Sequence, residues 1–286
     1  MCRFKNFKII IVLNIAIEIN ETRSFIEKQQ RPDDRKWLEA RPVTLKVSSI
    51  TTADGSATVR LGNTTVVCGV KAEISVPDLR EPNKGFIIPN IELHPCCSPT
   101  VKTGPPGEKA MVTSQFLAKV IESCNVIDKK TLCIVPNKLS WCLYCDVICL
   151  DYDGNLGDAS LLALVAALQD TTLPKVEYDE ETEKIVVESE KTEKLKVLSR
   201  PISTTITLYS SDIHRNKYNL LLDPTAEDES EGNGEITLVL KDSNTLGLTH
   251  KSGGQMVTPD NLQKFMDLAK KRVKELTKIM NKAFKT

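Results

Sequence analysis

The chain has 286 residues, of which 41% are hydrophobic and 27% charged, so it has the composition of a globular protein with room for one large domain or two small ones. Its 38 Lys and Arg residues balance 38 Asp and Glu residues. Autonomous nucleic-acid binders usually carry a basic excess, because phosphate contacts supply most of their non-specific affinity, so any RNA contact here must be local or shared with other chains.

The nine cysteines predict reduced thiols rather than a disulfide framework, because their number is odd and several lie in strand-like apolar runs. Cys142 and Cys145 form one C-x-x-C pair, but no second pair accompanies them and no His stands at zinc-finger spacing. Residues three apart in a strand also point to opposite faces, which prevents shared metal ligation. We read His94–Cys97 as plain loop and expect neither a metal nor a cofactor.

Residues 1–30 are expected to be a leader outside the family, or an unremarkable helix. Met1–Ile19 is basic and then apolar, as in a short signal peptide. However, Asn14 interrupts the apolar run, Glu18 closes it, and no small-residue cleavage site follows. The run is also too short to span a bilayer, so we expect no membrane association.

The first elements after the leader are predicted strands. Val43–Val47 alternates between apolar and polar residues, which indicates a half-buried strand. Ala57–Leu61 and Thr64–Lys71 flank Gly62-Asn63, a hairpin signal. Pro77–Gly107 contains seven prolines and is predicted to be loop-rich.

A helix is predicted to begin at Glu108 and to continue through Glu122. Its expected apolar face consists of Met111, Val112, Phe116 and Val120. A short strand, Leu132–Val135, follows it. The helix is thus expected to have one apolar face.

The stretch Trp141–Leu168 is predicted to be the structural centre. An apolar strand runs to a turn at Asp153–Asn155, and Ala159–Leu168 is so rich in Ala and Leu that it indicates a helix buried on nearly every side, with Asp158 as N-cap. The turn carboxylates Asp151, Asp153 and Asp158 stand where α/β folds often bind ligands, but turn formation and capping are the favoured explanation.

A charged segment, Glu177–Lys196, is expected to be a surface connection with a short hairpin. Beyond it the predicted strands are Ile202–Tyr209, Tyr218–Leu222, Glu235–Leu240 and Thr245–Thr249, with a turn at Pro224–Gly234. Thr258-Pro259 then starts a final helix in the preferred cap-then-Pro order. Its basic face is interpreted as solvated rather than RNA-binding.

Several motifs together resemble the RNase PH family, and within it the non-catalytic subunits of the RNA exosome ring. The matching segments are RPDDR (Arg31–Arg35), TADGSATVRLGNTTVVCGVKAE (Thr52–Glu73), PNKGFIIPN (Pro82–Asn90), GPPGEKA (Gly104–Ala110), WCLYCDVICLDYDGNLGDAS (Trp141–Ser160), LLLDPTAEDE (Leu220–Glu229) and LTHKSGG (Leu248–Gly254). The resemblance covers roughly residues 31–286, and RPDDR differs from the family's usual R-P-D-G-R.

The resemblance implies an α/β (α+β) RNase PH-like fold with two βαβα-type halves, mixed sheets and buried helices. The expected division is residues 31–176 for the first half, 177–200 for the charged connection and 201–286 for the second half. It further implies a subunit of a ring around an RNA channel. The expected partners are other RNase PH-type ring subunits, oligonucleotide-binding cap proteins and RNA, in the nucleus and nucleolus and also in the cytoplasm.

The resemblance also implies where an active site would lie. Active members hold phosphate with an Arg pair and carry two carboxylates in a D-L-N-x-x-E-D run; cations are needed there because phosphorolysis brings two anions together. Here Glu108-Lys109 stands at the Arg-Arg position, and the run reads Asp223 to Glu229 with altered residues between. We therefore expect a degenerate, inactive site near Glu108, Lys109, Asp223 and Glu229.

Two alternatives remain open from the sequence. An active phosphate-dependent 3'-exoribonuclease of the RNase PH type would use the same site, and a free-standing RNA-binding module is disfavoured by the absence of a basic excess or a known RNA-binding motif. The candidate RNA-contacting residues are Lys71, Arg80, Lys84, Lys102, Lys109 and Lys251. A solvated surface charge is the favoured explanation for the first five. Lys251 precedes Gly253-Gly254 and could approach a phosphate, but a turn into the final helix explains these glycines equally well.

Overall fold

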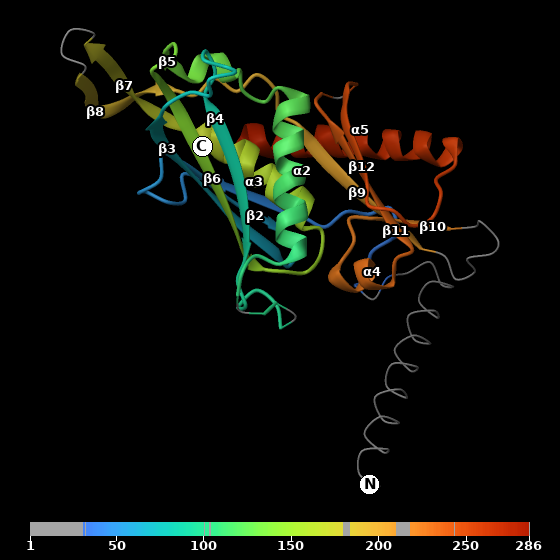
Figure 1. Ribbon diagram of the computed structural model, residues 1–286. Helices are drawn as coiled ribbons and strands as arrows, with labels where there is room; N and C mark the ends of the chain where they lie inside the picture. Colours follow the sequence, from blue (N-terminus) through green and yellow to red (C-terminus); the bar gives the residue numbers. More distant parts are fainter. Residues whose placement is uncertain are drawn as a thin grey trace, which may run out of the picture.

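A computed structural model describes residues 31, 33–99, 101–102, 104–179, 184–209, 218–242 and 244–285 (Figure 1). The predicted leader, residues 1–30, lies outside the described residues. In the described part of the chain, no helix is long and apolar enough to cross a membrane. None of the described cysteines forms a disulfide.

The first half is built on a six-stranded sheet in the order β1-β2-β3-β6-β4, with β5 paired to β6. Its strands are β1 (Val43–Val47), β2 (Gly55–Leu61), β3 (Thr64–Ser75), β4 (Phe86–Leu93), β5 (Cys133–Val135) and β6 (Leu139–Asp151). The register pairs Leu61 with Thr64 across Gly62-Asn63, so the predicted hairpin is confirmed. The sheet is mixed, because β4 runs parallel to β6 while the other pairs are antiparallel.

Strand β4 lies within Pro77–Gly107, which was predicted to be loop-rich and in which no strand was expected. It pairs only with β6, so it forms the edge of the sheet. Proline is tolerated in edge strands, because its missing N–H removes no ladder hydrogen bond when it faces outward. Pro89 therefore stands within the strand, opposite Cys145.

Helix α3 (Leu156–Asp170) lies at the centre of the molecule, as predicted for an Ala- and Leu-rich segment. Leu156 and every residue from Ala159 to Leu168 are buried. The helix packs against β2 and β3 on one side and against β9 of the second half on the other. Its N-cap is Asn155 and not Asp158, so the capping prediction is wrong by one turn.

The second half contains a four-stranded antiparallel sheet in the order β10-β9-β11-β12. Its strands are β9 (Ile202–Tyr209), β10 (Asn219–Leu222), β11 (Gly234–Leu240) and β12 (Leu246–Lys251). All residues of β9 are buried, since α3 and helix α5 (Pro259–Ala283) both pack against this strand. Thr258 precedes Pro259 as the N-cap of α5, as predicted.

Helix α2 (Glu108–Cys124) covers β4 and also contacts β12, so it joins the two halves (Figure 1). Its predicted apolar face is partly wrong. Phe116 and Val120 are buried, but Met111 and Val112 are 54% and 46% exposed. The buried face contains Ala110, Thr113 and Leu117 in their place.

Three shorter elements complete the fold. Strands β7 (Thr172–Asp179) and β8 (Lys184–Lys194) form a separate two-stranded hairpin, which matches the short hairpin expected in the charged segment. A 3-10 turn, η1 (Lys129–Leu132), leads into β5. Helix α4 (Ala226–Glu231) lies in the segment predicted to be a turn, and a capping box between Thr225 and Asp228 begins it.

Candidate functional site

The turn between β6 and α3 joins the two halves. Gly154 has a φ of +74°, and a Cβ there would lie 2.4 Å from the carbonyl carbon of Thr225 and 2.5 Å from the nitrogen of Ala226. Asn155 is also left-handed, with a φ of 53°. The turn therefore packs its backbone directly against the start of α4, and this contact brings the carboxylate run close to the N-termini of α2 and α3.

Asp223, the first carboxylate of that run, is a buried structural group. Its carboxylate accepts hydrogen bonds from the backbone N and the Nη2 of Arg41, both at 2.8 Å, and from Asn155 Nδ2 at 2.6 Å. Burial raises the pKa of Asp223, but these Arg41 and Asn155 hydrogen bonds outweigh burial and hold the pKa below its ordinary value. Asp223 is thus ionised and fully engaged.

The RPDDR segment supports the same corner. Arg31 is buried and donates to the carbonyl oxygens of Leu222 at 2.7 Å and of Trp37 at 3.0 Å. Asp34, at the position of the family's usual glycine, has a φ of 61°, a conformation that Asp tolerates better than most residues. The departure from R-P-D-G-R therefore preserves the turn.

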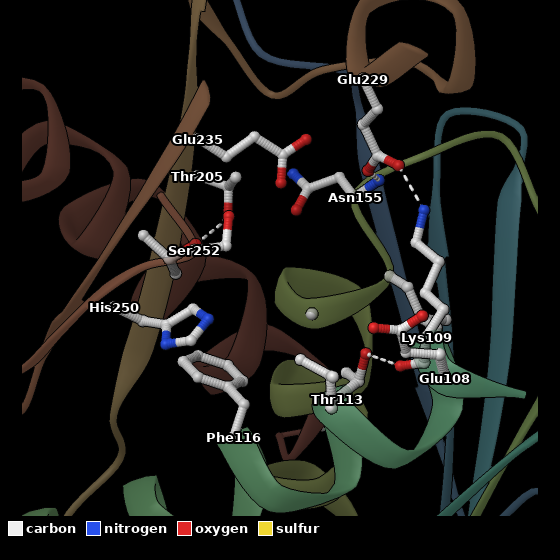
Figure 2. A pocket seen from close by; sticks show the side chains of 14 residues that line it. Glu108, Lys109, Thr113, Phe116, Asn155, Thr205, Glu229, Glu235, His250 and Ser252 are labelled. Atoms are coloured by element: carbon white, nitrogen blue, oxygen red, sulfur yellow. Dashed lines mark hydrogen bonds and ion pairs between the residues drawn. The ribbon is translucent and has the colours of Figure 1, made fainter. Parts of the chain in front are cut away.

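A cavity of about 340 Å³ lies between the N-termini of α2 and α3 and the strands β9, β11 and β12 (Figure 2). Its ionisable lining residues come from four elements and are Glu108, Lys109, Glu229, Glu235 and His250. The structure therefore brings Glu108, Lys109 and Glu229 together, as the degenerate-site hypothesis requires. Asp223 does not line this cavity.

Among the described residues, Lys109 is the only Lys or Arg that lines the cavity, and Glu229 pairs with it. The Lys109 Nζ lies 2.5 Å from Glu229 Oε2 and 4.5 Å from the centre of the Tyr152 ring. The Tyr152 hydroxyl donates to Glu229 Oε2 at 2.6 Å, and the backbone N of Asn155 donates to Glu229 Oε1 at 2.6 Å. Glu229, Tyr152 and Lys109 thus form one network, in which a carboxylate balances the ammonium charge.

Glu235, at the start of β11, adds a further acidic group. Burial, together with the nearby charge of Glu229, raises the pKa of Glu235 to about 7, and Lys109 offsets this only in part. His250 packs on Phe116 with ring centres 5.6 Å apart, and burial lowers its pKa, so it is largely neutral at pH 7. Three carboxyl groups and one ammonium therefore give the cavity a net negative charge.

The other candidate RNA-contacting residues do not form one cluster with Lys109. Lys102 lines a second cavity beside the N-terminus of α2, which Lys109 also borders. Lys71 pairs with Glu73 at 2.7 Å, and Lys84 pairs with Glu81 at 2.6 Å. Their positive charges are therefore partly balanced where they stand.

Arg80 and Lys251 also do not form a cluster with Lys109. Arg80 is exposed in the loop after β3, and its backbone N donates to Asp78. Lys251, at the end of β12, has its Nζ 3.4 Å from the carbonyl oxygen of Gly254. Of the six candidates, only Lys102 and Lys109 border a common cavity.

The turn carboxylates have structural roles. Asp158 is half-buried at the start of α3 and accepts hydrogen bonds from the backbone N and hydroxyl of Thr205, each at 2.9 Å, which ties α3 to β9. Asp153 lies 3.6 Å from Arg41. Among the described residues, no group of three or more His, Cys, Asp or Glu side chains could hold a metal ion.

Sequence reasoning did not identify Tyr152, Asn155 or Glu235 as site residues. The sequence predicts Asn155 only as part of a turn and Glu235 only as the first residue of a strand. Neither residue stands in a spacing pattern that signals a site, because their convergence depends on how the second sheet docks on α2 and α3. Only the three-dimensional structure reveals them.

Comparison with known proteins places this geometry in a family. Residues 39–174 match the first domain, and residues 200–272 the second domain, of RNase PH, the 3' exoribonuclease family. The Exosome complex component rrp43 of Schizosaccharomyces pombe is 37% identical over 86% of this chain and 89% of its own length. The Exosome complex component Rrp42 of Methanothermobacter thermautotrophicus is 33% identical over 90% of this chain and 92% of its own length.

Solved structures agree with the sequence relatives. A chain of the Archaeoglobus fulgidus exosome with RNA bound to the active site superposes with a TM-score of 0.79 at 32% identity, covering 93% of this chain and 98% of that one. A chain of an archaeal exosome core gives a TM-score of 0.75 at 29% identity, covering 94% and 98%. These matches confirm the predicted fold class and the resemblance. The chain belongs to the RNase PH, or 3' exoribonuclease, family.

Proposed function

We propose that this chain is a non-catalytic structural subunit of an RNA exosome core ring. In this role it supports 3'-to-5' RNA processing and degradation, including ribosomal RNA maturation and the decay of messenger and non-coding RNA, by organising the ring and its RNA channel. The proposal is supported by relatives named as exosome complex components, which match over most of the chain. Structural neighbours from exosome cores support it further.

The charge of the cavity is the observation that supports the proposed catalytic inactivity. A phosphorolytic site must gather two anions, inorganic phosphate and the RNA phosphate, which requires unpaired cations. Here Glu108 precedes Lys109 at the expected phosphate position, and Glu229 neutralises the lysine at 2.5 Å. Glu235 adds negative charge. Phosphate is therefore repelled where an active relative would bind it.

The proposed partners are other RNase PH-type ring subunits, oligonucleotide-binding cap proteins and RNA in the shared channel. Lys102, which lines the second cavity beside the N-terminus of α2, is the favoured RNA contact among the candidates, because Glu229 already pairs with Lys109. The proposed location is the nucleus and nucleolus and also the cytoplasm. The proposed division into halves at 31–176 and 201–286 is supported by the two family matches.

The test is to replace the endogenous subunit in its native source with a tagged copy that carries Glu229→Gln or Lys109→Gln. A structural subunit tolerates both changes: the other core components co-purify with it, and processed RNA ends accumulate as in the wild type. Leu164→Asp, which places a charge in the centre of α3, is the matched loss-of-assembly control.

If the site variants assembled normally but accumulated unprocessed RNA as severely as Leu164→Asp, a catalytic role would be indicated and the proposal refuted. If the tagged wild-type chain purified without the other core components, the ring assignment itself would be wrong.

A further inference from the structure

The cavity shown in Figure 2 has a net negative charge, which favours a positively charged ligand over phosphate. Glu108, Glu229 and Glu235 line it, and the one ammonium that the described part of the chain places there, on Lys109, already pairs with Glu229. An acidic cluster alone does not make a binding site, because carboxylates often serve only as surface charges. The second observation concerns the buried amide of Asn155.

Asn155 is 3% exposed, and both hydrogens of its Nδ2 group point to carboxylates. Nδ2 donates to Asp223 Oδ1 at 2.6 Å and to Asp158 Oδ2 at 3.0 Å. Two carboxylates can accept but not donate, so they fix the orientation of the amide. The Oδ1 atom must face the other way; it turns toward the cavity (Figure 2) and has no hydrogen-bond partner among the described residues.

Glu235 presents a second open acceptor. Its carboxylate makes no hydrogen bond or ion pair within the described part of the chain, and it points toward the same space as the Asn155 amide (Figure 2). Buried acceptors without donors are unfavourable, because they lose hydration without compensation. The Asn155 Oδ1 atom therefore lacks a donor among the described residues, and a positively charged donor would also balance the unpaired Glu235 carboxylate.

The remaining walls suit an organic cation rather than a metal ion. Phe116, with His250 packed on it, supplies an aromatic face, and Val112 and Leu156 supply apolar surface. Aromatic faces attract guanidinium and ammonium groups. The described residues offer no cluster of three or more His, Cys, Asp or Glu side chains at metal-binding geometry.

We propose that this cavity binds an organic cation, a guanidinium or primary ammonium group, whose N–H groups donate to the Glu235 carboxylate and the Asn155 Oδ1 atom beside the Phe116 ring. The cation comes either from a free small molecule or from a basic side chain of a neighbouring protein. The site occupies the place where active relatives would bind an anion, but it does not depend on the ring assignment.

The test uses isothermal titration of the purified chain at pH 8 with three probes: methylguanidinium, N-acetyl-arginine amide, and N-acetyl-citrulline amide as the neutral isostere. We expect the cations to bind and the citrulline compound not to bind. Binding of methylguanidinium as strongly as of the arginine compound indicates a free small cation. Binding of the arginine compound alone indicates a protein side chain.

Two variants should change the affinity in opposite directions. Glu235→Gln should weaken binding about tenfold or more, because it removes a charged acceptor. Lys109→Gln should strengthen binding several-fold, because it frees the Glu229 charge. A bound anion would give the opposite response to Lys109→Gln. Glu227→Gln, an exposed change on α4 outside the cavity, is the matched control and should have no effect.

Proton release gives a readout that a structural role would not produce. Glu235 is faced by Glu229, Lys109 and Asp158, and with its pKa near 7 it is about half protonated at pH 7. Cation binding at pH 7 should release up to about half a proton, seen as a dependence of the binding enthalpy on the buffer. Glu235→Gln should abolish it.

Three results would overturn the proposal. They are no binding of either cation, equal binding of the citrulline compound, and unchanged affinity in Glu235→Gln. Glu235 makes no hydrogen bond that the amide would lose, so this variant is expected to fold; its circular dichroism and melting temperature verify that before titration.

Discussion

Replacing Asp223 with asparagine separates a structural role for this carboxylate from a catalytic one. The pair with Arg41 is buried, with side chains 4% and 5% exposed and 2.8 Å between Oδ1 and Nη2. Removing one partner of a buried pair costs about 3–5 kcal/mol, because the other charge is left uncompensated. Arg41 also donates to the carbonyl oxygens of Asp153 at 2.6 Å and Pro224 at 3.1 Å, so we expect the lower end, about 3 kcal/mol.

For a chain of this size, 1 kcal/mol corresponds to about 2–4 °C in melting temperature, so calorimetry should show a decrease of about 6–12 °C. Asp153→Asn is the matched control. That carboxylate is 30% exposed and 3.6 Å from Arg41, and its loss should cost about 1 kcal/mol or less. A decrease for Asp223→Asn no larger than that for Asp153→Asn would refute the structural role.

The contribution of Asp223 to stability depends on pH with a defined sign. Although burial raises the pKa of Asp223, its Arg41 contacts lower it overall, so the folded pKa lies below the unfolded one. The stabilisation is therefore complete above the ordinary value of 3.8 and is lost as the pH falls through the folded pKa. The difference between wild type and Asp223→Asn should be constant from pH 8 to about pH 5 and should shrink in stronger acid.

Three further changes test the packing and the cavity. Gly154→Ala should lower the free energy of unfolding by about 1–3 kcal/mol in urea titrations, because Gly154 has a φ of +74° and the added Cβ would contact Thr225. Gly69→Ala is the control and should be near neutral, because its Cβ would make only ordinary contacts. Equal effects of the two changes would show that the turn is not tightly packed. Leu164→Ala should lower the free energy of unfolding by about 2–5 kcal/mol in the same assay, because Leu164 is buried. Met111→Ala, at a position 54% exposed, should lower it far less. A small effect at Leu164 would contradict the central position of α3. Burial and the Glu229 charge raise the folded pKa of Glu235 from 4.5 to about 7. The free energy of unfolding of the wild type should therefore fall as the pH rises from about 4.5 to 7, by roughly 1–2 kcal/mol after allowance for solvent screening. Glu235→Gln should lack this fall, and a pH profile parallel to that of the wild type would contradict the raised pKa of Glu235.

Much of the fold was predictable because local signals agreed with the tertiary context. Strand β9 has the predicted bounds Ile202–Tyr209, and the Gly62-Asn63 hairpin and the Thr258-Pro259 helix start also agree. Proline content concealed β4, because Pro89 is compatible with an edge strand. The capping box that starts at Thr225 was a local signal for α4 that the turn assignment overlooked.

The site was predictable only where the family resemblance reached it. Lys109 and Glu229 were identified from the motifs, and the structure brings them to 2.5 Å. The motif also suggested Asp223, but its side chain turns to Arg41 and not to the cavity. Glu235 and Asn155 reach the cavity from different halves, so no sequence spacing links them.

The central claim is that this cavity does not support phosphorolysis, and release of nucleoside diphosphates from poly(A) with inorganic phosphate tests it most directly. The purified chain alone should release none above a no-protein blank, and Glu229→Gln should be equally silent, because Glu108 and Glu235 still repel phosphate. Phosphate-dependent release by the wild-type chain that Glu229→Gln or Lys109→Gln abolished would contradict the account.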